Sequence, residues 1–350
     1  MSNVSAGTFT CSLVQDVIKQ AEDVFNPANP NPDYVADPGP QKMIMEIQTA
    51  RFTELQVPNK DYTVKGVYTD KCAAEVVDNY DVTEQCSISG VEAGQQCETY
   101  ELTVHKQSPG FKITDLKFRD LGPTASYAQE LAVNLAAEIK GMDEMVAAQA
   151  VAKLNSWKGT NLYTAAPGAV SGTTTSIPAV AWNPDLFAYF AVARNRNKLP
   201  NAKLFLGGLM EQALIKAELE SGTEQGAANV RKVRSLGQVY TDSFVTEVEL
   251  GGKYAFLVNP DSVGFAHQAR FQGGKYANGG FKRNANGKDQ ILTVVESNAF
   301  PGLYYDFIMQ ASCASGDDIM EGQLFFHGDW FLSPVRCNTS RTGVLRFACA

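Results

Sequence analysis

The 350-residue chain has no long hydrophobic run. Its apolar stretches, such as Leu204 to Met210, are far shorter than the roughly 18 residues that a transmembrane helix needs. Residues 1–20 contain neither a basic start nor an apolar block, so we expect no secretory signal there. Hydrophobic residues make up 44% of the chain and charged residues 19%, which is typical of a globular protein. The composition excludes a membrane-embedded protein, a collagen-like fibre and a small disulfide-stapled toxin.

Motifs for nucleotide binding and catalysis are also missing. The Gly-Lys pairs at Gly252, Gly274 and Gly287 lack the Ser or Thr that would complete a phosphate-binding loop, and no GxGxxG occurs. The segment Gly168 to Gly172 has one residue too many before its serine to be a nucleophile elbow. We therefore predict no catalytic, cofactor-binding or metal-binding residues, no cofactor and no small-molecule substrate. The chain has only three histidines, none in HxxH or HExxH spacing: His105, His267 and His327.

Positive charge is also scarce. The net charge is −8, and residues 1–150 carry 11 Lys and Arg against 22 Asp and Glu. Residues 151–300 carry 16 against 11, so the middle of the chain is basic. An acidic total argues against a dedicated nucleic-acid binder, because neutralising phosphates supplies most non-specific affinity. The asymmetry has two readings: ordinary variation of surface charge, or an acidic part of one copy lying on the basic part of another.

Seven cysteines are an odd number, so they cannot all pair within one chain. Cys72, Cys86 and Cys97, together with His105, supply four residues of zinc-ligand type, but without the close pairs usual in zinc sites. A late disulfide in that stretch, or between Cys337 and Cys349, is a second alternative. Unpaired thiols are the third alternative and the one we expect, since no secretory signal is visible.

Two N-terminal regions have little hydrophobic core of their own. Residues 1–54 are proline-rich between Pro27 and Pro40, which excludes a helix interior or a central strand and predicts an extended arm. The arm is either a tail or linker, or a segment that lies on a neighbouring molecule. Residues 55–120 contain alternating apolar and polar side chains, typical of a long β-hairpin. We expect this hairpin to gain stability by pairing with or packing against something else.

The clearest element is one long helix over residues 126–157. Apolar side chains recur there at steps of three and four, and Gly159 lies just past the end. A polar loop is predicted over 160–180. A compact α/β region and a strand-rich C-terminal part follow, with helices at 183–197 and 209–219 and strands at 203–206, 239–248, 253–258, 291–295, 303–311 and 323–331.

Residues 272–290 form a basic segment rich in Gly and Asn, which we predict to be a loop. It is either a mobile surface loop or a contact with the axis of an assembly or with nucleic acid. The candidate residues for a genome or axis contact are Lys275, Lys282, Arg283 and Lys288.

The order of these parts resembles the major capsid proteins of tailed bacteriophages, whose fold is named for phage Hong Kong 97. The long helix, 126–157, is similar to that family's spine helix, and 55–120 is similar to its extended loop. The segment NPDLFAYFAVARNRNKLPNAKLFLGGLMEQAL, from Asn183 to Leu214, looks like the entry into the family's axial domain. The passage from Gly264 to Phe307 looks like the return to its peripheral domain.

The resemblance implies an α+β, Hong Kong 97-like capsid fold. It divides the chain into an N-terminal arm at 1–54, an extended loop at 55–120, a peripheral domain at 121–165 and 250–350, and an axial domain at 166–249. The cysteines in the loop are not a usual family feature and mark a candidate insertion.

The function that the resemblance implies is structural, not enzymatic. Copies of the chain would assemble into hexamers and pentamers that form an icosahedral shell around the genome, in the host cytoplasm and then in the virion. Expected partners are other copies, scaffolding, portal and decoration proteins, and the genome through non-specific contact on the inner face, with no membrane. A bacterial nanocompartment shell shares the fold. Outside the family, an extracellular adhesin or binding module and a Cys–His enzyme are the alternatives.

Overall fold

The structure is a computed structural model of the full chain. The residues that it describes are 63–69, 95–114, 127–199, 201–210, 213–216, 230–233, 236–242, 253–260, 262–270, 280–283, 289–297, 299–300, 302–314, 317–332 and 341–350.

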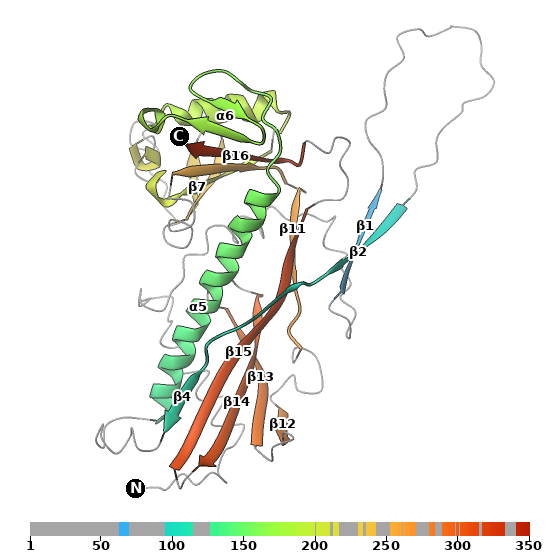
Figure 1. The fold of residues 1–350 in the computed structure, drawn as a ribbon, viewed down its shortest axis with the longest axis vertical. Coiled ribbons are helices and arrows are strands. Elements are labelled where there is room, and N and C mark those ends of the chain that lie inside the picture. The colour runs from blue at the N-terminus through green and yellow to red at the C-terminus, as the bar shows by residue number, and fades with distance from the viewer. Residues whose placement is uncertain are drawn as a thin grey trace, which may run out of the picture.

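Helix α5 spans Tyr127–Ser156 and runs along the length of the molecule (Figure 1). Its fully buried positions follow the spacing of three and four seen in the sequence, so one stripe of the helix faces the core. Glu130 in the first turn and Lys153 in the last turn complement the helix dipole. The prediction of one long helix over 126–157 is confirmed.

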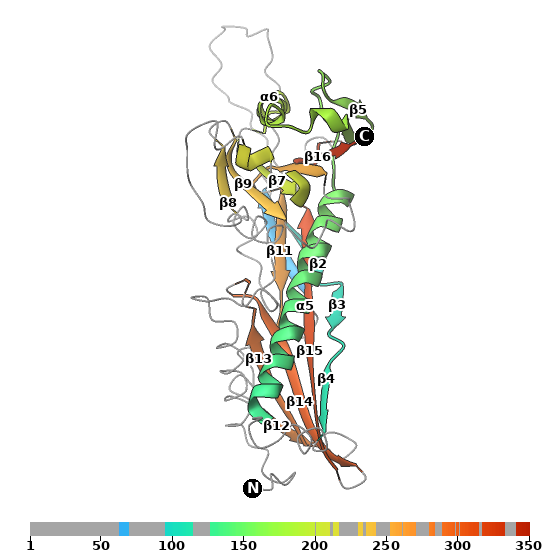
Figure 2. The same ribbon diagram turned by 90° about the vertical axis from the view of Figure 1, so that its left-hand side faces the viewer.

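A long antiparallel sheet lies beside α5 (Figures 1 and 2). Its main strands follow the order β11–β15–β14–β13–β12, and β15 pairs in addition with two short strands, β3 and β4. β15 is therefore the strand that connects β3 and β4 to the strands β11 to β14 of the later part of the chain. The bounds are β3 Val104–Gln107, β4 Phe111–Thr114, β11 Val263–His267, β12 Gly280–Arg283, β13 Asp289–Glu296, β14 Tyr304–Ala314 and β15 Asp317–Leu332.

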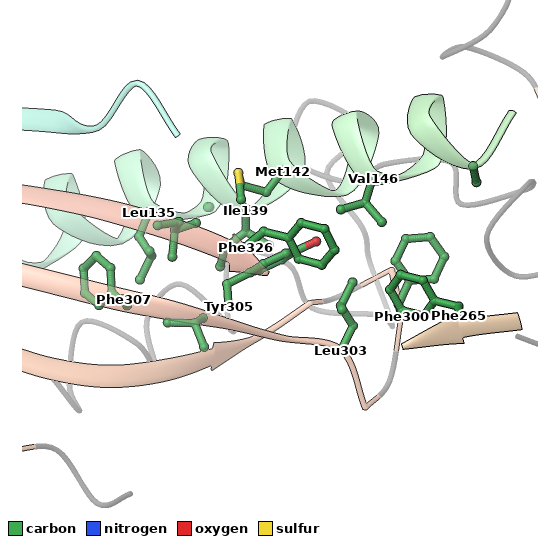
Figure 3. Packing of buried hydrophobic residues seen from close by; sticks show 14 of the residues in the cluster. Leu135, Ile139, Met142, Val146, Phe265, Phe300, Leu303, Tyr305, Phe307 and Phe326 are labelled. Carbon is green, nitrogen blue, oxygen red and sulfur yellow. The ribbon is translucent and has the colours of Figure 1, made fainter. Parts of the chain in front are cut away.

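The main core lies between α5 and this sheet. Alternate residues of each strand point toward the helix, as strand geometry requires. Figure 3 shows Leu135, Ile139 and Met142 of the helix facing aromatic side chains of the strands, among them Phe307 and Phe326. Burying each such side chain contributes about 1.5–3 kcal/mol. The helix and the sheet consequently hold each other in place along the whole length of α5.

Gly141 lies in the exposed middle of α5, and a Cβ atom built there meets no other atom within 4 Å. Gly141→Ala is therefore expected to raise the free energy of unfolding by about 0.5–1 kcal/mol, because glycine loses more backbone entropy in a helix. Chemical denaturation measures the gain. The matched control is Gly110→Ala, which is expected to destabilise because Gly110 has φ of +80° and its Cβ would lie 3.0 Å from the Gly322 oxygen. A Gly141→Ala variant less stable than the native chain would contradict the expectation.

A second sheet lies at one end of α5 (Figure 1). Its order is β5–β6–β16–β10–β7–β9–β8, mostly antiparallel, but β6 with β16 and β7 with β9 are parallel. The bounds are β5 Ala169–Ser171, β6 Thr174–Ile177, β7 Lys203–Gly207, β8 Val230–Val233, β9 Gly237–Asp242, β10 Tyr254–Val258 and β16 Val344–Cys349.

The middle of this second sheet is buried on both faces. Leu204 and Leu206 of β7 face a cluster that includes helix α6, Leu186–Arg196, whereas Phe205 between them joins the α5 core. β10 alternates in the same way, with all five of its residues buried. The sheet thus connects two hydrophobic cores. Two short 3₁₀ turns, Ala179–Ala181 and Gly208–Met210, flank α6 and β7 in the sequence.

A two-stranded antiparallel hairpin stands to one side of the long sheet (Figure 1). It consists of β1, Thr63–Thr69, and β2, Gln95–Glu101, paired along their whole length from Thr63 opposite Glu101 to Thr69 opposite Gln95. The predicted β-hairpin is confirmed for these strands. The range 55–120 also contains β3 and β4, which pair with β15, as the thin core of this segment led us to expect.

Several expectations need correction. The predicted polar loop at 160–180 contains the β5–β6 hairpin, because Thr175 and Ile177 are fully buried and β-branched residues favour strands. The predicted loop at 272–290 is wrong at Gly280–Arg283, where the backbone pairs with β13. β10 and β16, which the division of the chain placed with 250–350, are hydrogen-bonded into the sheet of 166–249.

Candidate functional site

A polar site with aromatic neighbours lies at the base of the projecting hairpin. We call Tyr100, Leu102, Thr103, Asp329 and Phe331 the hairpin root. The rings of Tyr100 and Phe331 lie 4.7 Å apart, and Leu102 is only 1% exposed. These apolar contacts attach the end of β2 to β15 directly before β3 begins to pair with the same strand.

Asp329 is the charged centre of the hairpin root. Its Oδ1 lies 2.8 Å from Lys153 Nζ on α5 and accepts a 2.8 Å hydrogen bond from the Trp330 amide. Its Oδ2 accepts a hydrogen bond from the Thr103 hydroxyl. Because Asp329 is only 3% exposed, its ion pair and hydrogen bonds are needed to offset the cost of burying its charge. One side chain thus joins the helix, the long sheet and the chain that leaves the hairpin.

Two histidines meet beside the hairpin root. His105 on β3 lies directly opposite His327 on β15, and their Nδ1 atoms are 2.7 Å apart. His327 Nε2 lies 3.9 Å from Asp306 Oδ2, and the same oxygen accepts a 3.0 Å hydrogen bond from the Arg270 amide. Burial, with the charges of Arg270 and His105, lowers the pKa of His327 to about 4. His327 is therefore neutral at pH 7.

A buried carboxyl group lies between α5 and β14. Tyr305 donates a 2.5 Å hydrogen bond from its hydroxyl to Asp143 Oδ1. Burial raises the pKa of Asp143 to about 7, although hydrogen bonds from Ser297 and Tyr305 act in the opposite direction. The pKa of the third histidine, His267, is lowered by burial to about 4.

Exposed large hydrophobic side chains gather in the part of the molecule around α6. Val180 is 87% exposed in the turn before α6, and Val192 on α6 is 41% exposed. The described residues of α5 and the long sheet contribute no side chain of this kind. Among the residues whose burial the structure describes, the exposed large hydrophobic side chains are Leu162, Val180, Val192 and Ile215.

The structure places only some of the candidate residues from the sequence. Cys97 lies on β2 with its backbone opposite Val67, and Cys349 at the end of β16 is a half-buried free thiol. Lys282 and Arg283 lie on β12, with their backbones opposite Gln290 and Asp289. The remaining candidates lie outside the described residues: Cys72, Cys86, Cys337, Lys275 and Lys288.

The candidates that the structure describes lie on three different strands, Cys97 on β2, Lys282 and Arg283 on β12, and Cys349 on β16. Within the described ranges, no three His, Cys, Asp or Glu side chains form a group able to hold a metal ion. Sequence reasoning missed the hairpin root and the histidine pair. His105 and His327 are 222 residues apart, and no spacing rule connects them. In the same described ranges, no helix is both long enough and apolar enough to cross a membrane.

Comparison with known proteins identifies the fold. No family model and no curated protein matches the sequence. Among solved structures, the chain is similar to "Cyanophage A-1(L) capsid asymmetric unit", with a TM-score of 0.50 and 10% identity, over 93% of this chain and 98% of that one. It is also similar to "Mycobacterium phage Che8", with a TM-score of 0.49 and 12% identity, over 87% and 90%.

The cyanophage comparison carries the conclusion. At 10% identity it is a likeness of fold, and it extends over nearly the whole of both chains. The chain has an α+β phage-capsid fold, so the resemblance to phage capsid proteins seen in the sequence is confirmed at the level of the fold.

Proposed function

We propose that this chain is a major capsid protein of a bacteriophage, a structural protein that assembles with copies of itself into the shell of the virion. The observation that carries the proposal is the fold shared with a cyanophage capsid chain from end to end. A similarity of fold does not by itself define function, so the proposal also rests on surfaces of this chain.

Two surfaces support self-association. The β1–β2 hairpin has only two strands, and an isolated hairpin is marginally stable in water. It would gain stability by lying on a neighbouring copy. The exposed hydrophobic residues around α6, including Val180, would be covered in an assembly, as in other obligate interfaces.

In this proposal the chain keeps the predicted arm, extended loop, peripheral domain and axial domain, but β10 and β16 move from the peripheral to the axial domain. Residues 1–54 form the arm and 55–120 the extended loop. The part containing α5 and the long sheet is the peripheral domain. The part containing α6 and the second sheet is the axial domain, now including β10 and β16. Hexamers and pentamers then form around axes near the α6 end.

The partners follow from the same proposal. The genome would lie against basic residues on the inner face, with Lys275, Lys282, Arg283 and Lys288 as candidates. Scaffolding, portal and decoration proteins would join during assembly in the host cytoplasm. The cysteines at 72, 86 and 97 stay a candidate insertion of the extended loop, with zinc, disulfide and free-thiol states as the alternatives.

Light scattering on a sizing column, with negative-stain electron microscopy of the same fractions, tests the proposal. We expect rings or closed shells. A single hexameric ring has six times the 38.0 kDa chain mass, or about 228 kDa. A 38.0 kDa monomer at every concentration reached, with and without a crowding polymer, would contradict it.

A further inference from the structure

The histidine pair is built by the register of the long sheet. β3 and β15 are antiparallel, and His105 lies directly opposite His327. Side chains of directly opposed residues in an antiparallel pair emerge on the same face of the sheet, with Cβ atoms about 4.5–5.5 Å apart. The two imidazole rings stand at 60° to one another, with centroids 5.0 Å apart. Two ring nitrogens from distant parts of the chain thereby lie within hydrogen-bond distance of one another.

The distance between the two nitrogens selects a coordination geometry. A metal ion bound by two imidazoles has metal–nitrogen bonds of about 2.0–2.1 Å. At a right angle, as in square-planar or octahedral sites, such bonds place the nitrogens about 2.9 Å apart, whereas the tetrahedral angle requires about 3.3 Å. The Nδ1 atoms of His105 and His327 are 2.7 Å apart. This hydrogen-bond distance is closer to the right-angle spacing than to the tetrahedral one, so the two nitrogens need to move apart least to occupy adjacent positions of a square-planar or octahedral ion.

We propose that His105 and His327 form a binding site for a divalent transition-metal ion that prefers square-planar or octahedral nitrogen ligands, namely Ni²⁺ or Cu²⁺. Both Nδ1 atoms supply lone pairs, and water fills the remaining positions. This site shares His105 with the zinc alternative considered for Cys72, Cys86 and Cys97, but its second ligand is His327 and it uses no thiolate.

The surroundings of His327 suit a metal ligand. Metal-bound histidines commonly direct their other ring N–H toward a carboxylate, which fixes the tautomer. Asp306 Oδ2 lies 3.9 Å from His327 Nε2, and the Arg270 amide holds that carboxylate through a 3.0 Å hydrogen bond. With its proton on Nε2, His327 presents the Nδ1 lone pair to the ion.

The present contact is a hydrogen bond, so one of the two Nδ1 atoms carries a proton. Metal binding requires the ring that donates through Nδ1 to change to the tautomer protonated on Nε2. In this change the proton moves from Nδ1 to Nε2 of the same ring, so none is gained or lost overall. His105 is exposed, so solvent and the ion reach the pair from that side.

A bound ion would cross-link β3 to β15 next to the hairpin root. β3 continues directly from β2 through Leu102 and Thr103, so the cross-link would restrict movement at the base of the hairpin. The metal site itself does not depend on the proposed capsid function, and its test is independent of assembly.

Calorimetric titration of the untagged full chain with Ni²⁺ tests the site. The variants are His105→Gln and, should that side chain disturb β3, His105→Asn. The matched control is His267→Gln, which changes the one histidine outside the pair. We expect binding that falls at least tenfold in affinity in the His105 variants and is unchanged in the control. Sites formed by the cysteines alone would persist in all variants. A site formed by the cysteines with His105 is distinguished by His327→Gln, which should weaken Ni²⁺ binding only if the histidine pair is the site.

A second measurement checks the link to the fold. Ni²⁺ at about 100 times its dissociation constant is expected to raise Tm by a few degrees in the native chain but not in the His105 variants, because a ligand of the folded state stabilises it. Cu²⁺ should bind more tightly than Ni²⁺, in the usual order of divalent ions. Equal Ni²⁺ affinity in the native chain and both His105 variants, or no binding at millimolar Ni²⁺, would overturn the proposal.

Discussion

The native chain is expected to lose stability as the pH rises from 4 to 8, and the Asp143→Asn variant is expected not to show this loss. Burial between α5 and β14 raises the pKa of the Asp143 carboxyl from 3.8 to about 7. In the folded state the group stays protonated up to neutral pH, while in the unfolded state it ionises near pH 4. The difference corresponds to about 4 kcal/mol.

The sign follows from the raised pKa. Below pH 4 both states are protonated, and the stability of the folded state is fully present. As the pH rises through 4 toward 7, the unfolded state releases its proton first, so the free energy of unfolding falls. Asp143→Asn cannot ionise, yet it keeps an oxygen that accepts the hydrogen bond from Tyr305. The variant should consequently lack this fall.

Chemical denaturation of the native chain and the variant at pH 4, 6 and 8 measures the effect. The difference in unfolding free energy between the two should grow by up to about 4 kcal/mol in favour of the variant from pH 4 to pH 8. Asp143→Ala is the control, because it also removes the titrating group but leaves the buried Tyr305 hydroxyl without this acceptor and is expected to destabilise at every pH. A difference between native chain and Asp143→Asn that does not change with pH would disprove the assignment.

Asp329→Ala is expected to lower the free energy of unfolding by about 1.5–3 kcal/mol, the size of a hydrogen bond to a charged group, because the partner Lys153 is 34% exposed and can still reach water. The substitution removes the contact with Lys153 and the acceptor for the Thr103 hydroxyl at once. It should also loosen the base of the β1–β2 hairpin. Thermal or chemical denaturation gives the stability, and hydrogen exchange of the β3 amides reports on the hairpin root.

Lys112→Ala is the matched control for an ion pair in the same sheet. Lys112 lies 3.9 Å from Glu321, but its side chain is 55% exposed, so its removal should cost less than about 1 kcal/mol. Asp329→Asn separates charge from hydrogen bonding, because its amide oxygen can still accept from Thr103. If Asp329→Ala and Lys112→Ala lowered the free energy of unfolding by equally small amounts, the contacts of Asp329 in the hairpin root would stabilise the fold no more than an exposed ion pair does.

The regular elements with strong local patterns could be predicted from the sequence. Helix α5 has apolar residues at steps of three and four over 30 residues, and this pattern fixes its buried face without knowledge of the fold. Helix α6 ends at Arg196, next to Asn197 and before Pro200, close to the end that the sequence indicated. β12 could not be predicted in this way, because it forms by pairing with β13 and its own composition is that of a loop.

The candidate site was far less predictable than the fold. The hairpin root joins Thr103 to Asp329, which are 226 residues apart, and the histidine pair joins residues 222 apart. A single Asp or His carries no local signal that identifies such a partner. Only the strand register, with β3 and β15 side by side, defines these contacts.

The place of β16 in the second sheet bears on how the chain folds during synthesis. Of the described strands β16 is the last to be translated, yet it lies between β6 and β10 and pairs with both. Until residues 344–349 have left the ribosome, the β5–β6 hairpin has no strand that links it to the rest of the sheet. Contacts between such distant segments form slowly. The part of the molecule around α6 would thus be completed only after α5 and most of the long sheet have been made. A chain still being synthesised would lack the complete second sheet and the surface that it forms with α6.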